Sequence, residues 1–122
     1  MLKVDGIEVA SAGSLLDACK AAGVEVDAPC HHRLVKPGGH CRGCLVEADG
    51  RLVAACTTPA TDGAVVRTTT DLLAAYRTDL AALVPPGPDV VDTSHRYLRI
   101  DLKECILCRL CVRVCAEVQG QF

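Results

Sequence analysis

Residues 30–56 read CHHRLVKPGGHCRGCLVEADGRLVAAC and contain four of the nine cysteines in this 122-residue chain. The first half of the stretch has no hydrophobic periodicity and is rich in glycine and proline, which predicts a loop. The second half predicts a β-hairpin, with strands over 45–48 and 51–55 on either side of an Asp49-Gly50 turn. Three thiols therefore lie on or beside one glycine-rich loop, and the fourth, Cys56, follows a strand.

Four thiols in this arrangement suit an iron–sulfur cluster. A [2Fe–2S] cluster takes four thiolate ligands and accepts hydrogen bonds from nearby backbone N–H groups. Gly38, Gly39 and Gly43 would let the loop backbone approach such a group closely. Cys41 and Cys44 can bind the same iron or different irons. The predicted [2Fe–2S] ligands are Cys30, Cys41, Cys44 and Cys56.

The residues around this stretch predict a small α+β domain. Asp5-Gly6 marks a second hairpin turn. Ser14, with Asp17 three residues later, predicts a helix N-cap with a weak capping box. Thr70 is the expected N-cap of a second helix. The signals predict strands over 2–4, 7–9, 45–48, 51–55 and 65–68, and helices over 15–22 and 71–84.

A second cysteine motif lies near the C-terminal end of the sequence. It reads Cys105-x2-Cys108-x2-Cys111-x3-Cys115. This spacing is typical of bacterial ferredoxins, where three thiols hold three corners of a [4Fe–4S] cluster. Cys115 could supply the fourth, although Ala116 replaces the proline that usually follows. Because no second run precedes Phe122, the alternatives are a short chain that borrows its fourth ligand and a truncated chain.

A proline cluster separates the two motifs. Pro85-Pro86-Gly87-Pro88 ends the preceding helix and predicts a stiff linker. We therefore expect a [2Fe–2S] domain with its following helix over 1–84, a proline-rich linker over 85–93 and a [4Fe–4S] segment over 94–122. A further strand is predicted over 97–101. The helix before the linker has one apolar stripe, formed by Leu72, Leu73, Tyr76, Leu80 and Leu83.

Composition narrows the class of protein. A net charge of -2 favours neither nucleic acid nor an anionic membrane surface as a partner. No apolar run is long enough for a membrane span, and residues 1–6 lack the features of a signal peptide, so we expect a cytoplasmic protein. An odd number of closely spaced cysteines in a reducing compartment favours metal binding over disulfides. No nucleotide-binding or nucleophile motif appears, so no substrate site of its own is expected.

Three segments around the first motif carry a family resemblance. They are Ala28-Pro29-Cys30, residues 39–47 (GHCRGCLVE) and residues 55–59 (ACTTP). Residues 2–70 resemble the N-terminal ferredoxin-like domain of the complex I iron–sulfur subunit. Similar domains occur in NAD-linked formate dehydrogenases, NAD-reducing hydrogenases and iron-only hydrogenases. The resemblance implies a β-grasp fold with the cluster under a surface loop.

The C-terminal part resembles the formate dehydrogenase and hydrogenase relatives. The matching segments are 92–94 (DTS), 100–101 (ID), Lys103, 105–108 (CILC), 111–115 (CVRVC) and 117–120 (EVQG). That family usually has a His-x3-Cys-x2-Cys-x5-Cys segment between the two modules, for another [4Fe–4S] cluster. Residues 57–104 contain no cysteine, so this middle cluster is expected to be absent. Arg109 stands where relatives often have glycine, and its charge should favour the reduced cluster.

The resemblance implies a relay subunit. It would carry single electrons between a catalytic subunit, of formate dehydrogenase or hydrogenase type, and a flavin-bearing NAD(H) subunit. The alternative is a free soluble ferredoxin, for which a charge of -2 gives little electrostatic steering. A zinc-binding interaction module is a further alternative, although zinc ribbons normally have a second close cysteine pair.

The remaining histidines and Cys19 are given structural roles. A Rieske centre would need two histidine ligands, but four thiols are already present. His31, His32 and His40 are therefore expected to be solvated loop residues. Cys19 lies on the apolar face of the first helix and is expected to be a buried structural thiol.

Overall fold

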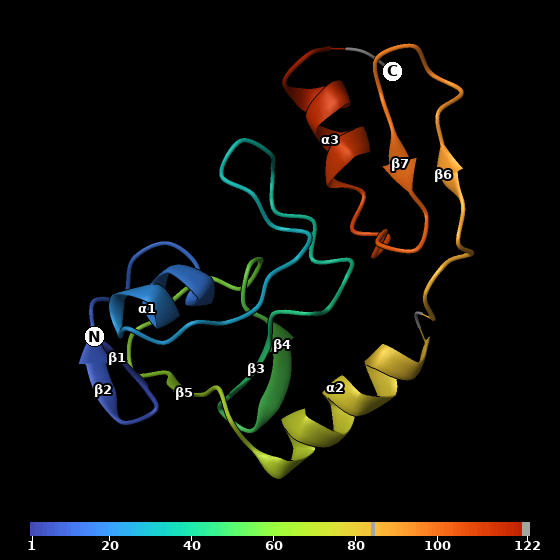
Figure 1. Cartoon of the computed structure of the whole chain (residues 1–122). Helices are drawn as coiled ribbons and strands as arrows, with labels where there is room; N and C mark the ends of the chain where they lie inside the picture. The colour runs from blue at the N-terminus through green and yellow to red at the C-terminus, as the bar shows by residue number, and fades with distance from the viewer. Residues whose placement is uncertain (84, 121–122) are drawn as a thin grey trace.

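The computed structural model describes residues 1–83 and 85–120 (Figure 1). The N-terminal part contains a five-stranded mixed sheet and two helices, and the C-terminal part contains a two-stranded sheet and one helix. In chain order the elements are β1 Leu2–Val4, β2 Ile7–Val9, α1 Leu15–Ala21, β3 Leu45–Ala48, β4 Arg51–Ala54, β5 Val65–Arg67, α2 Asp71–Leu83, β6 Val91–Asp92, β7 Ile100–Asp101 and α3 Leu110–Glu117.

Two tight hairpins build the outer parts of the larger sheet. In each turn an aspartate and a glycine both have positive φ, 48° and 87° at Asp5-Gly6 and 48° and 79° at Asp49-Gly50. Positive φ at both central residues is what two-residue hairpin turns require, and it explains the Asp-Gly dipeptides. Both predicted hairpins are thus confirmed.

β5 joins the two hairpins into one sheet. It pairs parallel to β1 and antiparallel to β3, which gives the strand order β2-β1-β5-β3-β4. The loop and helix between β2 and β3 therefore cross over the sheet rather than extending its edge. This arrangement confirms the predicted α+β class and the β-grasp, ferredoxin-like domain.

α1 is fixed at its start by the predicted cap. The Ser14 side chain accepts a hydrogen bond from the Asp17 N–H at 3.2 Å, and the Asp17 carboxylate accepts from the Ser14 N–H at 2.9 Å. The Leu15 and Leu16 N–H groups donate to the carbonyls of Thr58 and Ala55. These bonds attach the first turn of α1 to the segment that follows β4, where Cys56 lies.

The core is small and aliphatic. Cys19 is fully buried in it, in agreement with its expected structural role, and burial raises the pKa of its thiol. Cys44 and Cys56 also border this core. Its buried members are Leu2, Val4, Val9, Leu15, Leu16, Ala18, Cys19, Cys44, Leu45, Val46, Ala54, Ala55, Cys56, Ala64, Val66 and Leu73.

α2 begins as predicted, because the Thr70 hydroxyl accepts a hydrogen bond from the Leu73 N–H at 3.1 Å. Its predicted apolar stripe is only partly correct. Leu73 is fully buried, but Leu72 and Leu83 are 56% and 77% exposed. α2 packs on the sheet along one narrow face, so residues at the margins of the stripe face away from it. Val84, the predicted helix end, lies outside the described residues.

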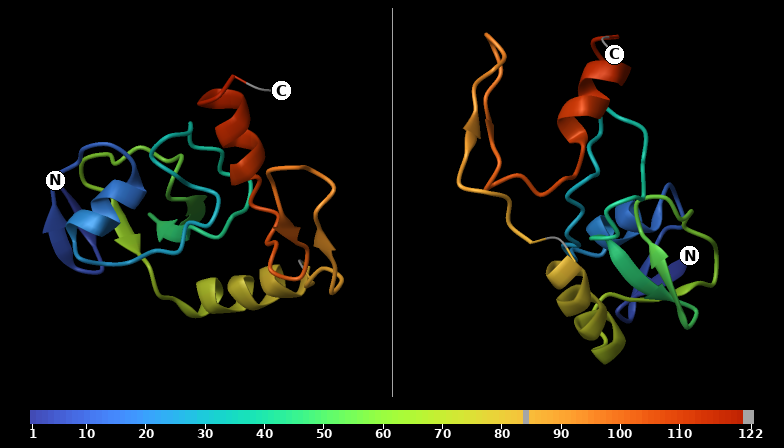
Figure 2. Two further views of the ribbon diagram at one scale, coloured as in Figure 1. Left: turned by 45° about the horizontal axis from the view of Figure 1, so that its top comes forward. Right: turned by 90° about the vertical axis from the view of Figure 1, so that its right-hand side faces the viewer.

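The C-terminal part stands beside the larger sheet in both further views (Figure 2). β6 and β7 form an antiparallel ladder in which Val91 pairs with Asp101 and Asp92 with Ile100. The strand predicted over 97–101 is therefore shorter than expected, and β6 was not predicted. β6 falls within the stretch 85–93 that was predicted as linker, since a two-residue strand leaves too little sequence pattern to detect. α3 has no buried residue.

Candidate metal centre

The four cysteines of the first motif lie at one end of the larger sheet. Cys30 ends the segment that follows α1, Cys41 and Cys44 lie before β3, and Cys56 follows β4. Cys30, Cys44 and Cys56 are at most 2% exposed, while Cys41 is half-buried. All four are free thiols. The structure thus brings the predicted ligands together from three separate parts of the chain.

The thiols fall into two pairs. The Cys41 side chain lies close enough to Cys30 to affect the pKa of its thiol, and the Cys44 side chain does the same at Cys56. The pairs are also within electrostatic range of each other, because Cys30 contributes to the raised pKa of Cys56. Among the described residues, no three histidine, cysteine or acidic side chains surround one point as a single metal ion requires. Two adjoining pairs match a cluster that spreads four thiolates over two irons.

Backbone N–H groups point at these sulfurs. The Gly43 N–H donates to Cys41 Sγ at 3.4 Å, and the Cys56 N–H donates to Cys44 Sγ at 3.5 Å. Further backbone N–H groups, from His40 and Gly39, are directed at the Cys30 and Cys56 thiols. Such donors favour the thiolate form that binds iron.

Burial acts in the opposite direction. It raises the pKa of Cys56 to about 11, with a further contribution from the Cys44 thiol, and it also raises the pKa of Cys41. At Cys30 burial alone would raise the pKa, but hydrogen bonds from Cys41 and the charge of Arg113 outweigh it and leave the pKa lowered. Four thiolates this close together need a compensating positive charge, which bound iron supplies.

The glycines of the loop occupy positions where a side chain would collide. A Cβ at Gly43 would lie 2.7 Å from Pro29 Cδ, and a Cβ at Gly39 would lie 2.9 Å from Thr57 Cγ2. Gly39 also has a φ of +63°. A Cβ at Gly38 would lie 2.7 Å from the His40 Nδ1. Neighbouring side chains therefore leave no room for a Cβ at these positions, and the approach of the loop backbone to a cluster stays a prediction.

One of the three histidines near the motif differs from the expectation of solvated side chains. His32 and His40 are exposed, but His31 is partly buried, and its Nδ1 is a buried atom without a hydrogen-bond partner in the described part of the chain. His31 directly follows Cys30. An unpaired polar atom beside a ligand position fits a site that also holds sulfide acceptors. The donor set and its surroundings therefore fit a [2Fe–2S] cluster.

Comparison with protein families agrees with this geometry. Residues 1–71 match the 2Fe-2S iron-sulfur cluster binding domain. The chain belongs to this family. The predicted iron–sulfur, electron-transfer character is thereby confirmed for the N-terminal part.

Individual relatives extend the similarity to the whole chain. An NADH-quinone oxidoreductase subunit of Rhizobium meliloti is 29% identical over 163 residues, covering 98% of this chain and 19% of the relative. The alpha subunit of the NADPH-Fe(3+) oxidoreductase of Geobacter sulfurreducens is 30% identical over 158 residues, covering 98% and 19%. An NADH-quinone oxidoreductase subunit of Mycobacterium bovis is 44% identical over 71 residues, covering 55% and 9%. The chain thus spans less than a fifth of the length of these relatives.

A solved structure shares the fold. A chain of an NAD+-reducing [NiFe]-hydrogenase superimposes with a TM-score of 0.77 at 26% identity, covering 98% of this chain and 66% of that chain. Together with the matches to NADH-quinone oxidoreductase subunits, this confirms the resemblance to the complex I iron–sulfur subunit and to NAD-reducing hydrogenases. No helix in the described ranges is long and apolar enough to cross a membrane.

The second cysteine motif of this iron–sulfur protein is more exposed. Cys105 and Cys108 are half-buried on the loop before α3, and Cys111 and Cys115 are exposed on α3. The last two are four residues apart on the helix and therefore lie on one face. The loop contains two non-glycine residues in the left-handed region, Leu107 at a φ of 58° and Arg109 at 62°.

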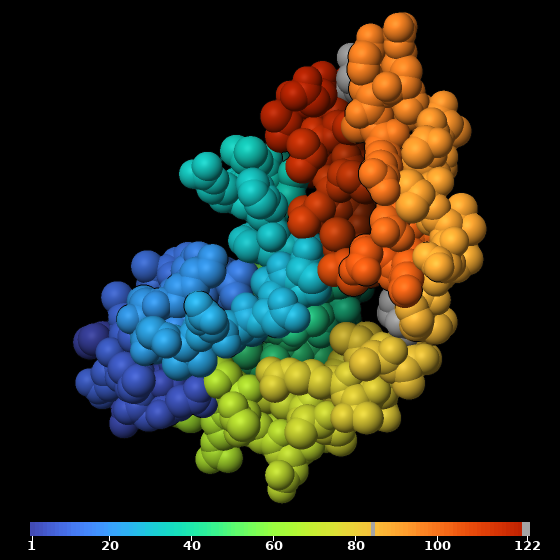
Figure 3. All heavy atoms as spheres, viewed as in Figure 1, coloured from blue at the N-terminus to red at the C-terminus, as the bar shows by residue number. Residues whose placement is uncertain are grey.

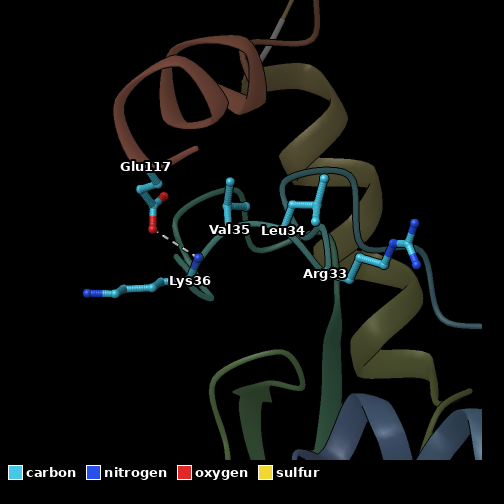
Figure 4. A pocket seen from close by; sticks show the side chains of 5 residues that line it. All are labelled: Arg33, Leu34, Val35, Lys36 and Glu117. Carbon is cyan, nitrogen blue, oxygen red and sulfur yellow. Dashed lines mark hydrogen bonds between the residues drawn. The ribbon is translucent and has the colours of Figure 1, made fainter. Parts of the chain in front are cut away.

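The C-terminal part contacts the loop that carries the first motif. Arg113 donates to the backbone carbonyls of Cys30 and Lys36. Glu117 Oε1 accepts from the Lys36 N–H at 3.0 Å (Figure 4). His40 Nε2 donates to the carbonyl of Cys108 at 2.8 Å. Sequence reasoning missed the roles of Arg113, Lys36 and Glu117, because no spacing pattern links residues so far apart in the chain.

Proposed function

We propose that this chain relays single electrons between two iron–sulfur clusters as a subunit of a larger NAD(H)-linked oxidoreductase. Thiolate-ligated clusters with no open iron position transfer electrons and carry out no other chemistry. The observation that supports this most is the presence of two adjoining thiol pairs in a domain of the [2Fe–2S] family. Three of these four thiols are buried.

The two thiol pairs support a ligand assignment. Cys30 and Cys41 would hold one iron, and Cys44 and Cys56 the other. The buried positions of Cys30, Cys44 and Cys56 keep water from their sulfurs. The protein's part is to hold the four thiolates in place without rearrangement, since the sheet and α1 fix their backbone.

The second cluster is proposed at the C-terminal motif. The left-handed residues Leu107 and Arg109 flank Cys108, and a backbone of this kind can direct N–H groups at an anionic cluster. Cys111 and Cys115 add two thiols from one face of α3. The proposed [4Fe–4S] ligands are Cys105, Cys108, Cys111 and Cys115.

The proposed context follows the named relatives. They are subunits of an NADH-quinone oxidoreductase, an NADPH-Fe(3+) oxidoreductase and an NAD+-reducing hydrogenase. Partners of this chain would be a flavin-bearing NAD(H) subunit and a catalytic subunit of hydrogenase or formate dehydrogenase type, in the cytoplasm, where thiols stay reduced. The formate dehydrogenase context remains a prediction.

The relay would lack the middle cluster of the family. The alignment with the Rhizobium relative is 163 positions long although this chain has 122 residues, so that relative has residues within the matched span that this chain lacks. This supports a path of two clusters. We also propose the division into a [2Fe–2S] part over 1–84, a connection over 85–93 and a [4Fe–4S] segment over 94–122.

Anaerobic purification with iron and acid-labile sulfide analysis tests the proposal. Two filled sites give about six irons per chain, two plus four. Cys56→Ser should remove the [2Fe–2S] signal from EPR spectra of the reduced protein, and Cys108→Ser the [4Fe–4S] signal. Cys19→Ala is the matched control and should leave the iron content unchanged, because Cys19 belongs to neither cysteine motif.

Two outcomes would contradict the proposal. Colourless protein that contains zinc and no sulfide would indicate the zinc-binding alternative. Full clusters in a chain that co-elutes with no larger redox subunit from its native extract would indicate the free ferredoxin alternative.

A further inference from the structure

α3 lies against the loop 30–44 that carries three of the proposed [2Fe–2S] ligands. The space-filling view shows the red helix touching the cyan loop (Figure 3), and the close-up shows Glu117 reaching the Lys36 backbone (Figure 4). The two regions are 83 residues apart in sequence at Arg113 and Cys30. Their contact is therefore tertiary packing and not a consequence of chain connectivity.

Arg113 makes the largest set of polar contacts in this interface. Its two terminal nitrogens donate to two different carbonyls, those of Cys30 and Lys36. Its Nε lies 4.0 Å from the Glu117 carboxylate, which in turn accepts from the Lys36 N–H. The Arg113 side chain is only 16% exposed. A planar guanidinium is suited to bind two carbonyls at once in this manner.

Apolar packing does not hold α3 in this position. α3 has no buried residue, and its Val112 is 58% exposed. The loop makes room for the arginine, since a Cβ at Gly38 would lie 3.3 Å from the guanidinium carbon. His40, which directly precedes Cys41, adds a hydrogen bond to the Cys108 carbonyl at 2.8 Å. The interface between the loop 30–44 and the C-terminal part is therefore formed by polar contacts.

We propose that Arg113 is a positioning residue that docks the [4Fe–4S] segment on the [2Fe–2S] loop, so that the two clusters exchange electrons directly. This inference rests on the proposed function, because it requires both clusters. Residues 57–104 contain no cysteine that could hold a further cluster between the two motifs. The transfer moves one electron and no atom: one cluster is oxidised as the other is reduced, and the adjoining redox subunit supplies or removes that electron.

The charge of Arg113 has a second consequence. The guanidinium donates a hydrogen bond to the carbonyl of Cys30, a proposed [2Fe–2S] ligand. The contact is partly buried, so Coulomb interactions there are stronger than in water. A cluster gains negative charge on reduction. Arg113 therefore stabilises the reduced [2Fe–2S] cluster and raises its midpoint potential.

Variants of Arg113 in the full chain test the proposal by EPR and redox titration. In the wild-type protein with both clusters reduced, we expect magnetic interaction between the two signals. Arg113→Ala should keep about six irons per chain, lose that interaction and shift the [2Fe–2S] midpoint potential to more negative values. Arg113→Lys should shift the [2Fe–2S] midpoint potential less than Arg113→Ala does, because lysine keeps the positive charge. It should still lose the magnetic interaction, because lysine cannot bind two carbonyls as the guanidinium does.

Arg99→Ala is the matched control, since it removes the same charge from an exposed position in the C-terminal part. It should change neither the interaction nor the potential. If Arg113→Ala binds less iron, Glu117→Gln decides instead, because it weakens the same contact and leaves the arginine in place. Glu117→Gln should then reduce the interaction at full iron content.

The outcomes separate this inference from the proposed function. A wild-type chain with only two irons overturns the pair of clusters itself, and with it the docking role. A wild-type chain with six irons but no magnetic interaction overturns the direct contact alone. Unchanged interaction in Arg113→Ala, or in Glu117→Gln where that variant decides, overturns the positioning role while the relay stands.

Discussion

The two cysteine motifs of this chain are supported in different ways. In the N-terminal motif, three thiols are at most 2% exposed and two of them border an aliphatic core. In the C-terminal motif, two thiols are exposed on a helix that has no buried residue. The first site is positioned by a five-stranded sheet and an aliphatic core. The second has no such support within the described residues.

This difference shows what each cluster contributes to the fold. A segment as short as 85–120 cannot bury enough apolar surface to fold alone. Its apolar side chains remain outside, with Ile106 and Leu107 57% and 68% exposed. We infer that cluster ligation and the Arg113 contact hold the C-terminal part, as metals do in other small domains. We expect the [2Fe–2S] site, in contrast, to belong to a domain whose core folds without the metal.

Removal of both clusters should separate the two regions most clearly. In the apo protein we expect the amides of β1, β3 and β5 to stay protected from hydrogen exchange, because the core remains. The α3 amides, such as the Arg113 N–H that donates to the Arg109 carbonyl, should exchange within about tenfold of the unprotected rate. Hydrogen exchange measured by mass spectrometry gives the protection of the sheet amides and of the α3 amides in the same apo sample, so the two regions can be compared directly.

The holo protein is the control for that experiment, and its α3 should be protected. Equal protection of α3 in the apo and holo proteins would show that the helix is stable without its cluster. Loss of protection in β1 and β5 of the apo protein would show that the N-terminal domain also depends on its metal. Either result would break the contrast between the two regions.

Core substitution should have the next largest effect. Leu73→Ala should lower the free energy of unfolding of the N-terminal domain by about 2–5 kcal/mol, because Leu73 is fully buried. Leu72→Ala is the matched control in the same helix and should change it by at most about 0.5 kcal/mol, since Leu72 is largely exposed. Denaturant titration followed by far-UV circular dichroism measures both. Equal effects would mean that α2 packs through a different face.

Much of the N-terminal domain could be predicted because its signals are local. The Asp5-Gly6 and Asp49-Gly50 turns and the Ser14 cap each depend on residues next to one another in sequence. The cysteine spacing likewise predicted a ligand set, and the structure places those four residues at one end of the sheet, although their binding of iron stays a prediction. The parallel pairing of β1 with β5 is not encoded in any local pattern, but the resemblance implied it through the β-grasp fold.

The interface between the two motifs could not be predicted in this way. Arg113 reads as one charged residue between two cysteines, and nothing nearby indicates that it reaches the Cys30 carbonyl. The short strand β6 also escaped prediction, because two residues carry no alternation. The apolar stripe predicted for α2 contains residues that are exposed in the structure. Periodicity indicates which face of a helix is apolar, but it does not indicate how much of that face a small sheet can cover.

The α1 cap offers a smaller and pH-dependent effect in the N-terminal region. Ser14→Ala should destabilise the domain by about 1 kcal/mol at pH 7, because the Asp17 N–H loses its cap. Hydrogen bonds from the Ser14 backbone and side chain lower the pKa of Asp17. The stability that Asp17 adds is therefore fully present above its unfolded pKa, near 4, and is lost as the pH falls through the lower folded value.

Denaturant titrations at several pH values check this prediction. The difference between the wild type and Ser14→Ala should shrink as the pH is lowered from 5 to about 2, as Asp17 becomes protonated in both states. Asp27→Asn is the control, an exposed carboxylate in the same domain, and should show no such trend. A constant difference at all pH values would mean that the Asp17 carboxylate does not take part in the cap.

The smallest effect is expected in the C-terminal region, where backbone strain and charge can be separated at one residue. Arg109 has a φ of 62°, and this conformation costs a residue with a Cβ about 1–2 kcal/mol. Glycine avoids this cost, but it also raises the conformational entropy of the unfolded chain, which offsets part of the gain in stability. Arg109→Gly should therefore stabilise the loaded segment by about 0.5–1 kcal/mol. Release of [4Fe–4S] absorbance during denaturant titration measures it.

Arg109→Ala separates the two contributions, because it removes the same charge but keeps the Cβ. It should show no gain in stability, whereas both variants should shift the [4Fe–4S] midpoint potential to more negative values, since each loses a positive charge beside the cluster. Equal stability of the glycine and alanine variants would mean that the loop relaxes around its cluster. The left-handed turn would then be set by ligation and not by the sequence, which would extend the contrast between the two regions to the backbone itself.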